Sequence, residues 1–409
     1  MNLNLQRWVD RWVGIPLCAA VSAVDALLNC FKPTVKAEAE PRAIVVILLS
    51  EMGSLVLAHD MFKRLKTRYP NAPLHALLFH KNRDILDLMG VIDPANVHTV
   101  DDNSFKGLLT SLVRAVTELR HAHVDVAIDC ELFSRISSLL SYFSGAAVRV
   151  GFYRHTQEGL YRGTHINRRV PYNPYHHISA QFLALARSID STAHPVSKLP
   201  ATTLTQAPPH VALVPGLVPG IAQRLAADFP ALAGKPLVLV YPGGGILPIR
   251  AWPLASYTAL CAELVADGCA VAVIGLKDDQ ALARQLVRQV QHIAAGGIVD
   301  LTGYTRSIAE LLALFHIARL LVTNDGGPGQ FAALTPIWTL MLFGPETPSL
   351  YAPHTPRCYS FYSHWPCSPC LTAYNHRASY CDGDNQCLKV IQADTVLAKA
   401  RECLIEMAA

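Results

Sequence analysis

The sequence carries little charge and no extended basic block. Of its 409 residues, 16% are Asp, Glu, Lys or Arg, whereas 51% are hydrophobic. Disordered chains combine low hydrophobicity with high net charge, so this composition excludes disorder for most of the length. The net charge of +4 is spread thinly, which argues against a nucleic-acid partner. At about 100–200 residues per domain, the length predicts two domains.

The N-terminal region lacks a long uninterrupted apolar run. Its uncharged stretch extends from Trp12 to Val24, about a dozen residues, whereas a membrane-spanning helix needs about 20. Two tryptophans and two arginines lie at the start of this stretch, as is typical of an amphipathic helix lying in the membrane interface. We therefore expect residues 1–41 to form an interfacial helix and a linker. A signal peptide and an ordinary helix docked on the protein are the alternatives.

Strand-like and helix-like stretches alternate along the rest of the chain. Short apolar runs rich in branched residues, which are typical of buried parallel strands, occur at 43–49, 74–79, 124–130, 237–241, 270–275, 320–323 and 337–343. Amphipathic segments separate them. This alternation predicts an α/β protein whose parallel sheets are covered by helices on both faces.

A stretch rich in Pro, Thr and Ser at 191–210 divides the alternation into two series. We therefore expect two Rossmann-like domains, residues 42–205 and residues 206–409, that face a cleft. The second would also contain the Cys-rich segment 358–387 and a C-terminal helix. Ligands of such sheets bind at the carboxyl ends of the strands.

Two glycine-rich turns follow predicted strands of the second domain. Neither turn matches GxGxxG or GxxxxGK[ST], which disfavours a dinucleotide site or a P-loop. Glycine lets backbone amides approach an anion, and a helix N-terminus favours negative charge. Each turn alone is equally consistent with an ordinary tight turn, but together they predict a diphosphate site. Its candidate residues are Gly243, Gly244, Arg250, Asn324, Asp325, Gly326, Gly327 and Gln330.

The same turns lie in stretches that resemble glycosyltransferase family 9. Residues 242–264, PGGGILPIRAWPLASYTALCAEL, are similar to the family's Pro-Gly turn followed by a basic residue two before Trp-Pro. Arg250 takes the place of that basic residue, usually Lys. Residues 299–348 resemble the family's central block, in which Asp-Ser/Thr-Gly-x-x-His opens a helix. A glycine replaces the Ser/Thr here, and Gln330 replaces the His.

The resemblance, which covers residues 42–392, implies the GT-B fold of two Rossmann-like domains with a cleft between them. It implies an inverting glycosyltransferase with a nucleotide-sugar donor, typically ADP-heptose, and a lipopolysaccharide-core or related glycan acceptor. It implies no catalytic cofactor, because arginine and helix termini would hold the donor. With the N-terminal helix, it implies a cytoplasmic enzyme, peripheral on the inner face of the bacterial inner membrane. The alternatives are a catalytically weak or inactive nucleotide-sugar-binding scaffold and a sugar-nucleotide epimerase.

The expected catalytic base is missing from its usual place. Residues 50–54 resemble the family's Ser-x-x-Gly-Asp turn, whose Asp is the base by the resemblance, but Ser54 stands at that position. A neutral hydroxyl cannot accept a proton at pH 7 without a base of its own. The chemistry still requires a carboxylate or His near the cleft. Glu51 in the same turn is our first candidate, followed by Asp129 and Glu131 at the end of a predicted strand.

A long polar and aromatic stretch, residues 153–178, follows the first series. Its basic residues and their neighbours would suit an anionic acceptor, and a solvated loop is the alternative. The resemblance is clearest at His177, just before a predicted helix. The candidate acceptor-binding residues are Ser54, Arg149, Arg154 and His177.

Four of the eleven cysteines cluster near the C-terminus. Cys367, Cys370, Cys381 and Cys387 are separated by two, ten and five residues. A CxxC pair followed by two further cysteines is typical of a structural zinc or iron site. Disulfides and free thiols are the alternatives.

Overall fold

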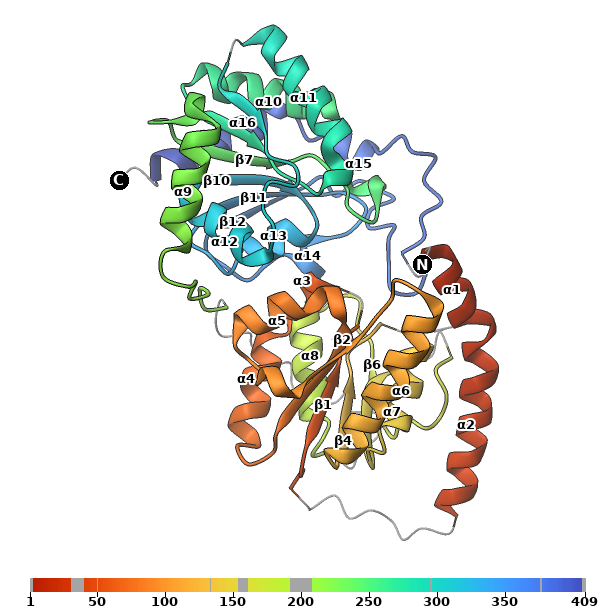
Figure 1. Ribbon diagram of the computed structural model, residues 1–409. Coiled ribbons are helices and arrows are strands. Elements are labelled where there is room, and N and C mark those ends of the chain that lie inside the picture. The colour runs from red at the N-terminus through yellow and green to blue at the C-terminus, as the bar shows by residue number, and fades with distance from the viewer. Residues whose placement is uncertain are drawn as a thin grey trace. The chain divides into compact units, whose positions relative to one another are not determined.

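The protein, described here as a computed structural model, forms two compact units, Met1–Thr205 and Gln206–Ala409 (Figure 1). The described residues are 3–30, 40–49, 51–132, 134–153, 161–191, 208–294, 296–375 and 377–406. Most of the expected linker before residue 42 and most of the Pro-, Thr- and Ser-rich stretch at 191–210 lie outside them. Each unit is described by itself.

The first unit contains a six-stranded sheet in which every pair of neighbouring strands is parallel. The strand order is β3-β2-β1-β4-β5-β6. Every residue of the central strands β1 and β4 is buried, and β1 consists entirely of branched apolar residues, as the sequence pattern predicts. The strands are β1 (Ile44–Ile47), β2 (Leu74–Phe79), β3 (Val97–Val100), β4 (Val126–Asp129), β5 (Val148–Tyr153) and β6 (Arg168–Pro171).

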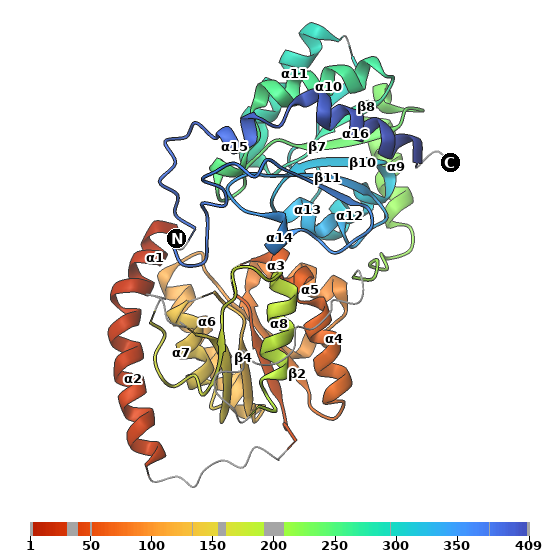
Figure 2. The ribbon, with the colours of Figure 1, turned by 180° about the vertical axis from the view of Figure 1, so that it is seen from behind.

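Helices cover this sheet (Figure 2). The helix predicted after β1 is divided at Ala58 into a short and a longer helix. Ser104 and Ser134 begin two of the later helices by accepting a backbone N–H with their hydroxyl groups. The helices are α3 (Met52–Leu57), α4 (His59–Arg68), α5 (Arg83–Met89), α6 (Phe105–His121), α7 (Arg135–Phe143) and α8 (Ile178–Arg187).

The N-terminal helices α1 (Leu3–Trp12) and α2 (Gly14–Asn29) are anchored to this unit. The Asp10 carboxylate accepts hydrogen bonds from the backbone N and Nη1 of Arg135, at 2.8 and 3.0 Å. Asp25 pairs with Arg149 at 3.1 Å. The helical stretch Trp8–Leu28 is nevertheless long and apolar enough to cross a membrane by length and composition alone, which the sequence analysis did not expect. It exposes many large apolar side chains: Trp8, Trp12, Val13, Leu17, Val24, Leu27 and Leu28.

The second unit repeats the architecture of the first. Its six parallel strands follow the order β12-β11-β10-β7-β8-β9, which is the same arrangement of successive strands. The edge strand β12 begins at Cys358, so this cysteine lies in the sheet and not in a loop. The strands are β7 (Leu237–Tyr241), β8 (Ala270–Val273), β9 (Ile298–Asp300), β10 (Leu320–Asn324), β11 (Trp338–Phe343) and β12 (Cys358–Tyr362).

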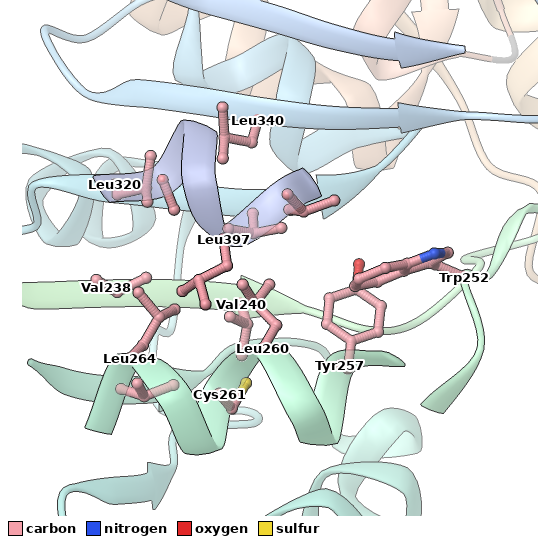
Figure 3. Packing of buried hydrophobic residues seen from close by; sticks show 14 of the residues in the cluster. Val238, Val240, Trp252, Tyr257, Leu260, Cys261, Leu264, Leu320, Leu340 and Leu397 are labelled. Carbon is pink, nitrogen blue, oxygen red and sulfur yellow. The ribbon is translucent and has the colours of Figure 1, made fainter. Parts of the chain in front are cut away.

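The core of the second unit joins its first strand to the helix that follows it and to the C-terminal helix. In Figure 3, Val240 of β7, Leu260 of α10 and Leu397 of α16 pack together. Trp252 lies beside them, and its indole N–H donates to the Ile391 carbonyl at 3.0 Å. The helices are α9 (Leu217–Asp228), α10 (Leu254–Ala266), α11 (Gln280–Ile293), α12 (Ile308–Ile317), α13 (Gly327–Ala332), α14 (Pro348–Tyr351), α15 (Gln386–Lys389) and α16 (Ala393–Glu406).

Each sheet has one point at which the strand order reverses. It lies between β1 and β4 in the first unit and between β7 and β10 in the second. Helices leave on opposite faces at such a point, so ligands of open α/β sheets bind just beyond the carboxyl ends of these two strands. The residues that follow β1, β4, β7 and β10 are therefore the candidates for a functional site.

Candidate functional site

The turns after β7 and β10 lie side by side because one buried amide joins them. Asn324, the last residue of β10, donates from Nδ2 to the Gly243 carbonyl at 3.0 Å. Its Oδ1 accepts the backbone N–H of Trp252 at 2.9 Å. Asn324 is fully buried. Asn324, which the sequence predicted to bind the diphosphate, therefore uses its side chain to hold the two turns together.

The surroundings of the glycines differ between the two turns. A Cβ on Gly244 would lie 2.7 Å from the Leu247 carbonyl oxygen, and Gly245 has φ +60°, so the first turn needs both glycines. This tight turn leads directly into the short 3-10 helix that ends at Arg250. A Cβ on Gly326 would meet nothing closer than the Asn324 carbonyl oxygen at 3.9 Å. The fold therefore leaves open space at Gly326.

Arg250 lies at the centre of a network of four charged side chains. Its Nε is 3.6 Å from Asp325 Oδ2, and its Nη2 is 2.8 Å from Glu346 Oε2. The other carboxylate oxygen of Glu346 is 3.2 Å from Nε of Arg377. Only 3% of the Glu346 side chain is exposed. The second unit thus gathers two guanidinium groups and two carboxylates at the carboxyl ends of β10 and β11.

Burial perturbs the ionisation of this network. It raises the pKa of Glu346 to about 8, although the neighbouring Arg250 cation lowers that pKa and Asp325 raises it further. Burial also lowers the pKa of Arg250, but Asp325 and Glu346 more than offset this effect, and the net pKa is raised. The arginine stays charged in a water-poor site, where its attraction for an anion is stronger than in bulk water.

Gln330 and Gly327 belong to α13, which follows the second turn. Gln330 is buried and donates from Nε2 to the Tyr351 carbonyl at 2.7 Å, so it ties α13 to α14. Gly327 is the first residue of α13. The amide that the sequence analysis expected on a phosphate is therefore engaged with the backbone of the protein.

In the first unit, acidic residues follow the two central strands. Glu51 comes just after β1, and its Oε2 accepts the Ser54 hydroxyl at 3.1 Å. Glu131 comes just after β4, and its Oε1 accepts the Leu49 backbone N–H at 2.6 Å. Asn82 donates to the Leu49 carbonyl at 2.6 Å. The structure therefore places Glu51, Glu131 and Ser54 at the carboxyl edge of the sheet, where the strand order reverses.

The third candidate base, Asp129, is in a different environment. Its side chain has no exposed surface and forms an ion pair with Arg162. It also accepts the Ser137 hydroxyl at 3.0 Å. Burial is the main reason that its pKa is raised, to about 6. With these partners, Asp129 ties β4 to α7 and to residue 162, and it is not accessible to an acceptor hydroxyl in this conformation.

The candidate acceptor-binding residues are dispersed. Arg149 is buried, and its three guanidinium nitrogens donate to Asp25 and to the carbonyls of Ala146 and His165. This arginine anchors α2 and does not point to a ligand. His177 begins α8, where its Nδ1 accepts the Ser179 N–H at 3.2 Å. Arg154 lies outside the described residues.

All eleven cysteines lie in the described part of the chain, and none forms a disulfide. Cys387 is buried, and its pKa is raised to about 11, first by burial and then by the charges of Cys370, Cys367 and Cys381. Ser379 Oγ donates to Cys370 Sγ at 3.2 Å and accepts the Cys381 backbone N–H at 3.1 Å, so these two cysteines lie close together. Within the described residues, however, no three His, Cys, Asp or Glu side chains are arranged as a ready metal site.

Glu346, Arg377, Asn82 and Asn385 are not among the residues predicted from the sequence. Glu346 follows β11 directly after a Gly-Pro pair, and its place just beyond the carboxyl end of a strand is a signal that could have identified it. Asn82 follows β2 in the same way. Arg377 and Asn385 lie far from any strand end, so no local pattern marks them.

Comparison with known proteins gives a consistent picture. The family model for glycosyltransferase family 9 (heptosyltransferase) matches residues 112–380. The lipooligosaccharide heptosyltransferase 2 of Haemophilus ducreyi is 24% identical over 312 residues, which cover 76% of this chain and 85% of that protein. The solved structure of Escherichia coli ADP-heptose lps heptosyltransferase II has a TM-score of 0.68 at 20% identity, and the match covers 90% of this chain and 100% of that one. The bacterial iron-containing dodecameric glycosyltransferase TibC, from enterotoxigenic Escherichia coli, has a TM-score of 0.51 at 14% identity, and the match covers 89% of this chain and 78% of that one.

Proposed function

Since the chain belongs to glycosyltransferase family 9, we propose that this glycosyltransferase moves a heptose from ADP-heptose to a lipopolysaccharide-core or related glycan acceptor. One observation carries the proposal: Arg250 contacts Asp325 and Glu346 directly beside the two turns that follow β7 and β10. A guanidinium group at this position suits a diphosphate. The names of the H. ducreyi and E. coli heptosyltransferases support the choice of sugar, nucleotide and acceptor.

The proposed reaction inverts the configuration of the transferred sugar. A carboxylate base, for which we propose Glu51, takes the proton of the acceptor hydroxyl as its oxygen forms a bond to the anomeric carbon. The bond from that carbon to the diphosphate breaks on the opposite face, and the electron pair leaves with the nucleotide diphosphate. Arg250 stabilises the negative charge that develops on the leaving group. Such stabilisation is strongest in a buried site of this kind.

A scaffold that binds nucleotide sugar without transferring it is the second candidate. Two observations favour it: Ser54 stands where the family resemblance places a base, and the Gln330 amide donates to the Tyr351 carbonyl. Both residues belong to positions that the resemblance assigns to the reaction. Transfer and donor binding must therefore be measured separately.

We also propose that the N-terminal helices rest on the cytoplasmic face of the inner membrane. Trp8 and Trp12 expose 56% and 59% of their surface, and Arg11 lies against the ring of Trp12. Indole rings and cations favour the depth of the lipid head groups. The ion pairs of Asp10 and Asp25 hold the opposite side of the helices on the protein, which supports attachment without insertion across the bilayer.

Ligand stabilisation of the purified protein tests the donor. Stability rises with the ratio of ligand concentration to dissociation constant, so ADP-heptose should raise the melting temperature more than GDP- or UDP-sugars. In the same preparation, the protein should co-sediment with vesicles containing anionic phospholipid and transfer heptose to a core acceptor held in them. Donor stabilisation without transfer would favour the scaffold. No stabilisation by any nucleotide sugar would reject both candidates.

We further propose that Cys367, Cys370, Cys381 and Cys387 hold one structural zinc or iron ion. Four thiolates suit either metal. Ser379 Oγ donates to Cys370 Sγ at 3.2 Å and accepts the Cys381 backbone N–H at 3.1 Å, which supports a short distance between two of the four cysteines. The ion would cross-link the Cys-rich segment and take no part in transfer. Purified protein should contain about one equivalent of metal by elemental analysis, and Cys381→Ser should lose it. Cys30→Ser, which changes an exposed thiol far away in sequence, should not. Metal-free protein with four titratable thiols would contradict the proposal.

A further inference from the structure

Glu346 holds two guanidinium groups that come from distant parts of the second unit. Arg250 precedes α10, whereas Arg377 lies in the Cys-rich segment. Both reach the same carboxylate, Arg250 at Oε2 and Arg377 at Oε1. About 15% of the Arg377 side chain is exposed, so this end of the network borders solvent.

A buried network of this kind is weak evidence for stability. The cost of removing charges from water cancels most of their mutual attraction, and apolar residues often serve as well. Two guanidinium groups facing one anion are, however, a common way to bind phosphate, because each presents a planar set of N–H donors. The arrangement around Glu346 therefore has the composition of a binding site and includes the arginine that we assign to the donor diphosphate.

The Cys-rich segment is attached to the turn that carries Arg250. Asn385 donates from Nδ2 to the carbonyl of Ile249, the residue before Arg250, at 2.8 Å. The Oδ1 of the same amide lies 3.4 Å from Sγ of Cys381. Cys381 thus contacts a side chain that supports the Arg250 turn directly. The segment is connected to the proposed donor site both through Asn385 and through Arg377.

Arg377 itself is held in a defined position. Its backbone N–H donates to the Thr372 carbonyl at 2.9 Å, and its φ of +56° lies in the left-handed region, which is uncommon for residues other than glycine. Its guanidinium carbon lies 5.4 Å from the centre of the Tyr351 ring, a cation–π distance. Tyr351 in turn accepts from Gln330 of α13. The Arg377 side chain therefore lies against Tyr351 of α14, and the Tyr351 carbonyl is tied to α13 through Gln330.

We propose that Arg377 is a second cation of the donor site and binds the diphosphate of the nucleotide sugar together with Arg250. This inference rests on the proposed function. Glu346 is the positioning residue, because its carboxyl group holds both guanidinium groups where they can bind the same diphosphate. The Cys-rich segment accordingly contributes a binding residue to the reaction, in addition to any structural metal that it holds.

Calorimetric titration with ADP and with adenosine tests this role. Arg377→Gln should weaken ADP binding about tenfold, since a charge-assisted hydrogen bond is lost, and leave adenosine binding unchanged. Arg377→Lys keeps the charge but not the planar set of donors, so its ADP affinity should lie between those of Arg377→Gln and the parent protein. Arg401→Gln removes an exposed arginine that pairs with Asp267 in the same unit, and it should change neither titration.

The outcomes separate the two levels of the proposal. If the parent protein binds neither ADP nor ADP-heptose, the proposed donor is wrong. If the parent protein binds ADP and Arg377→Gln binds it equally well, the proposed function stands and the role of Arg377 is rejected. An equal loss of ADP and adenosine binding in Arg377→Gln, or a loss in Arg377→Lys as large as in Arg377→Gln, also rejects it, because a structural defect and not a missing charge would then be responsible.

Discussion

Arg250→Gln should lower kcat/KM for heptose transfer by about a hundred- to a thousand-fold. The substitution removes the cation that we place against the departing diphosphate. It also removes the contacts by which Arg250 holds the carboxyl groups of Asp325 and Glu346, so the donor site should lose part of its arrangement. The dissociation constant of the donor should therefore rise, and kcat should fall. Initial rates over a range of donor concentrations, with a separate titration of ADP, measure the two effects.

Two variants control for unfolding and for loss of charge in general. Arg250→Lys restores a cation of the type that the family resemblance leads us to expect here, and it should recover a large part of the activity. Lys cannot form the paired hydrogen bonds of Arg, so recovery should be incomplete. Arg401→Gln should behave as the parent protein. Normal turnover and normal ADP affinity in a folded Arg250→Gln protein would show that Arg250 does not bind the donor diphosphate.

The turns around Arg250 could be predicted because their signals are local. The apolar runs at 237–241 and 320–323 have the composition of buried parallel strands, and the glycines follow them at once. In the structure the two strands are neighbours, with Thr323 opposite Tyr241. Once adjacent strands are parallel, their following turns must meet at one edge of the sheet. Sequence reasoning could therefore place Gly243 and Asp325 on the same edge without knowledge of side-chain contacts.

Contacts between distant parts of the sequence could not be predicted in this way. Glu346 and Arg377 are 31 positions apart, and nothing in the local pattern of either residue indicates that they meet. Asp129 shows the same limit. Its place at a strand end suggested a catalytic base, whereas in the structure it forms a buried ion pair with Arg162. Arg149 looked like a surface cation in a basic region, but it is an anchor for the N-terminal helix through Asp25. In each case a long-range ion pair decides the role of the residue.

Glu51→Gln should lower kcat by about a hundred- to ten-thousand-fold, the usual contribution of a general base. The amide has nearly the shape of the carboxylate but cannot accept the proton of the acceptor hydroxyl. The Ser54 hydroxyl, which donates to Glu51 at 3.1 Å, can still donate to the amide oxygen, so the turn should keep its conformation. ADP binding should not change, because the residue belongs to the first unit and the diphosphate-binding residues to the second. Single-turnover rates with saturating donor isolate the chemical step.

The neighbouring acidic residue provides the decisive comparison. Glu131→Gln removes the other carboxylate at the same sheet edge, but its Oε1 accepts the Leu49 backbone N–H, which the amide oxygen can also accept. If Glu51 is the base, Glu131→Gln should keep most of the turnover, and Glu402→Gln, which alters an exposed carboxylate of α16, should keep all of it. Ser54→Ala should lower kcat far less than Glu51→Gln, since a neutral hydroxyl only orients the base. A severe loss in Glu131→Gln with an active Glu51→Gln protein would transfer the role to Glu131, and full activity in both variants would show that neither carboxylate accepts the proton.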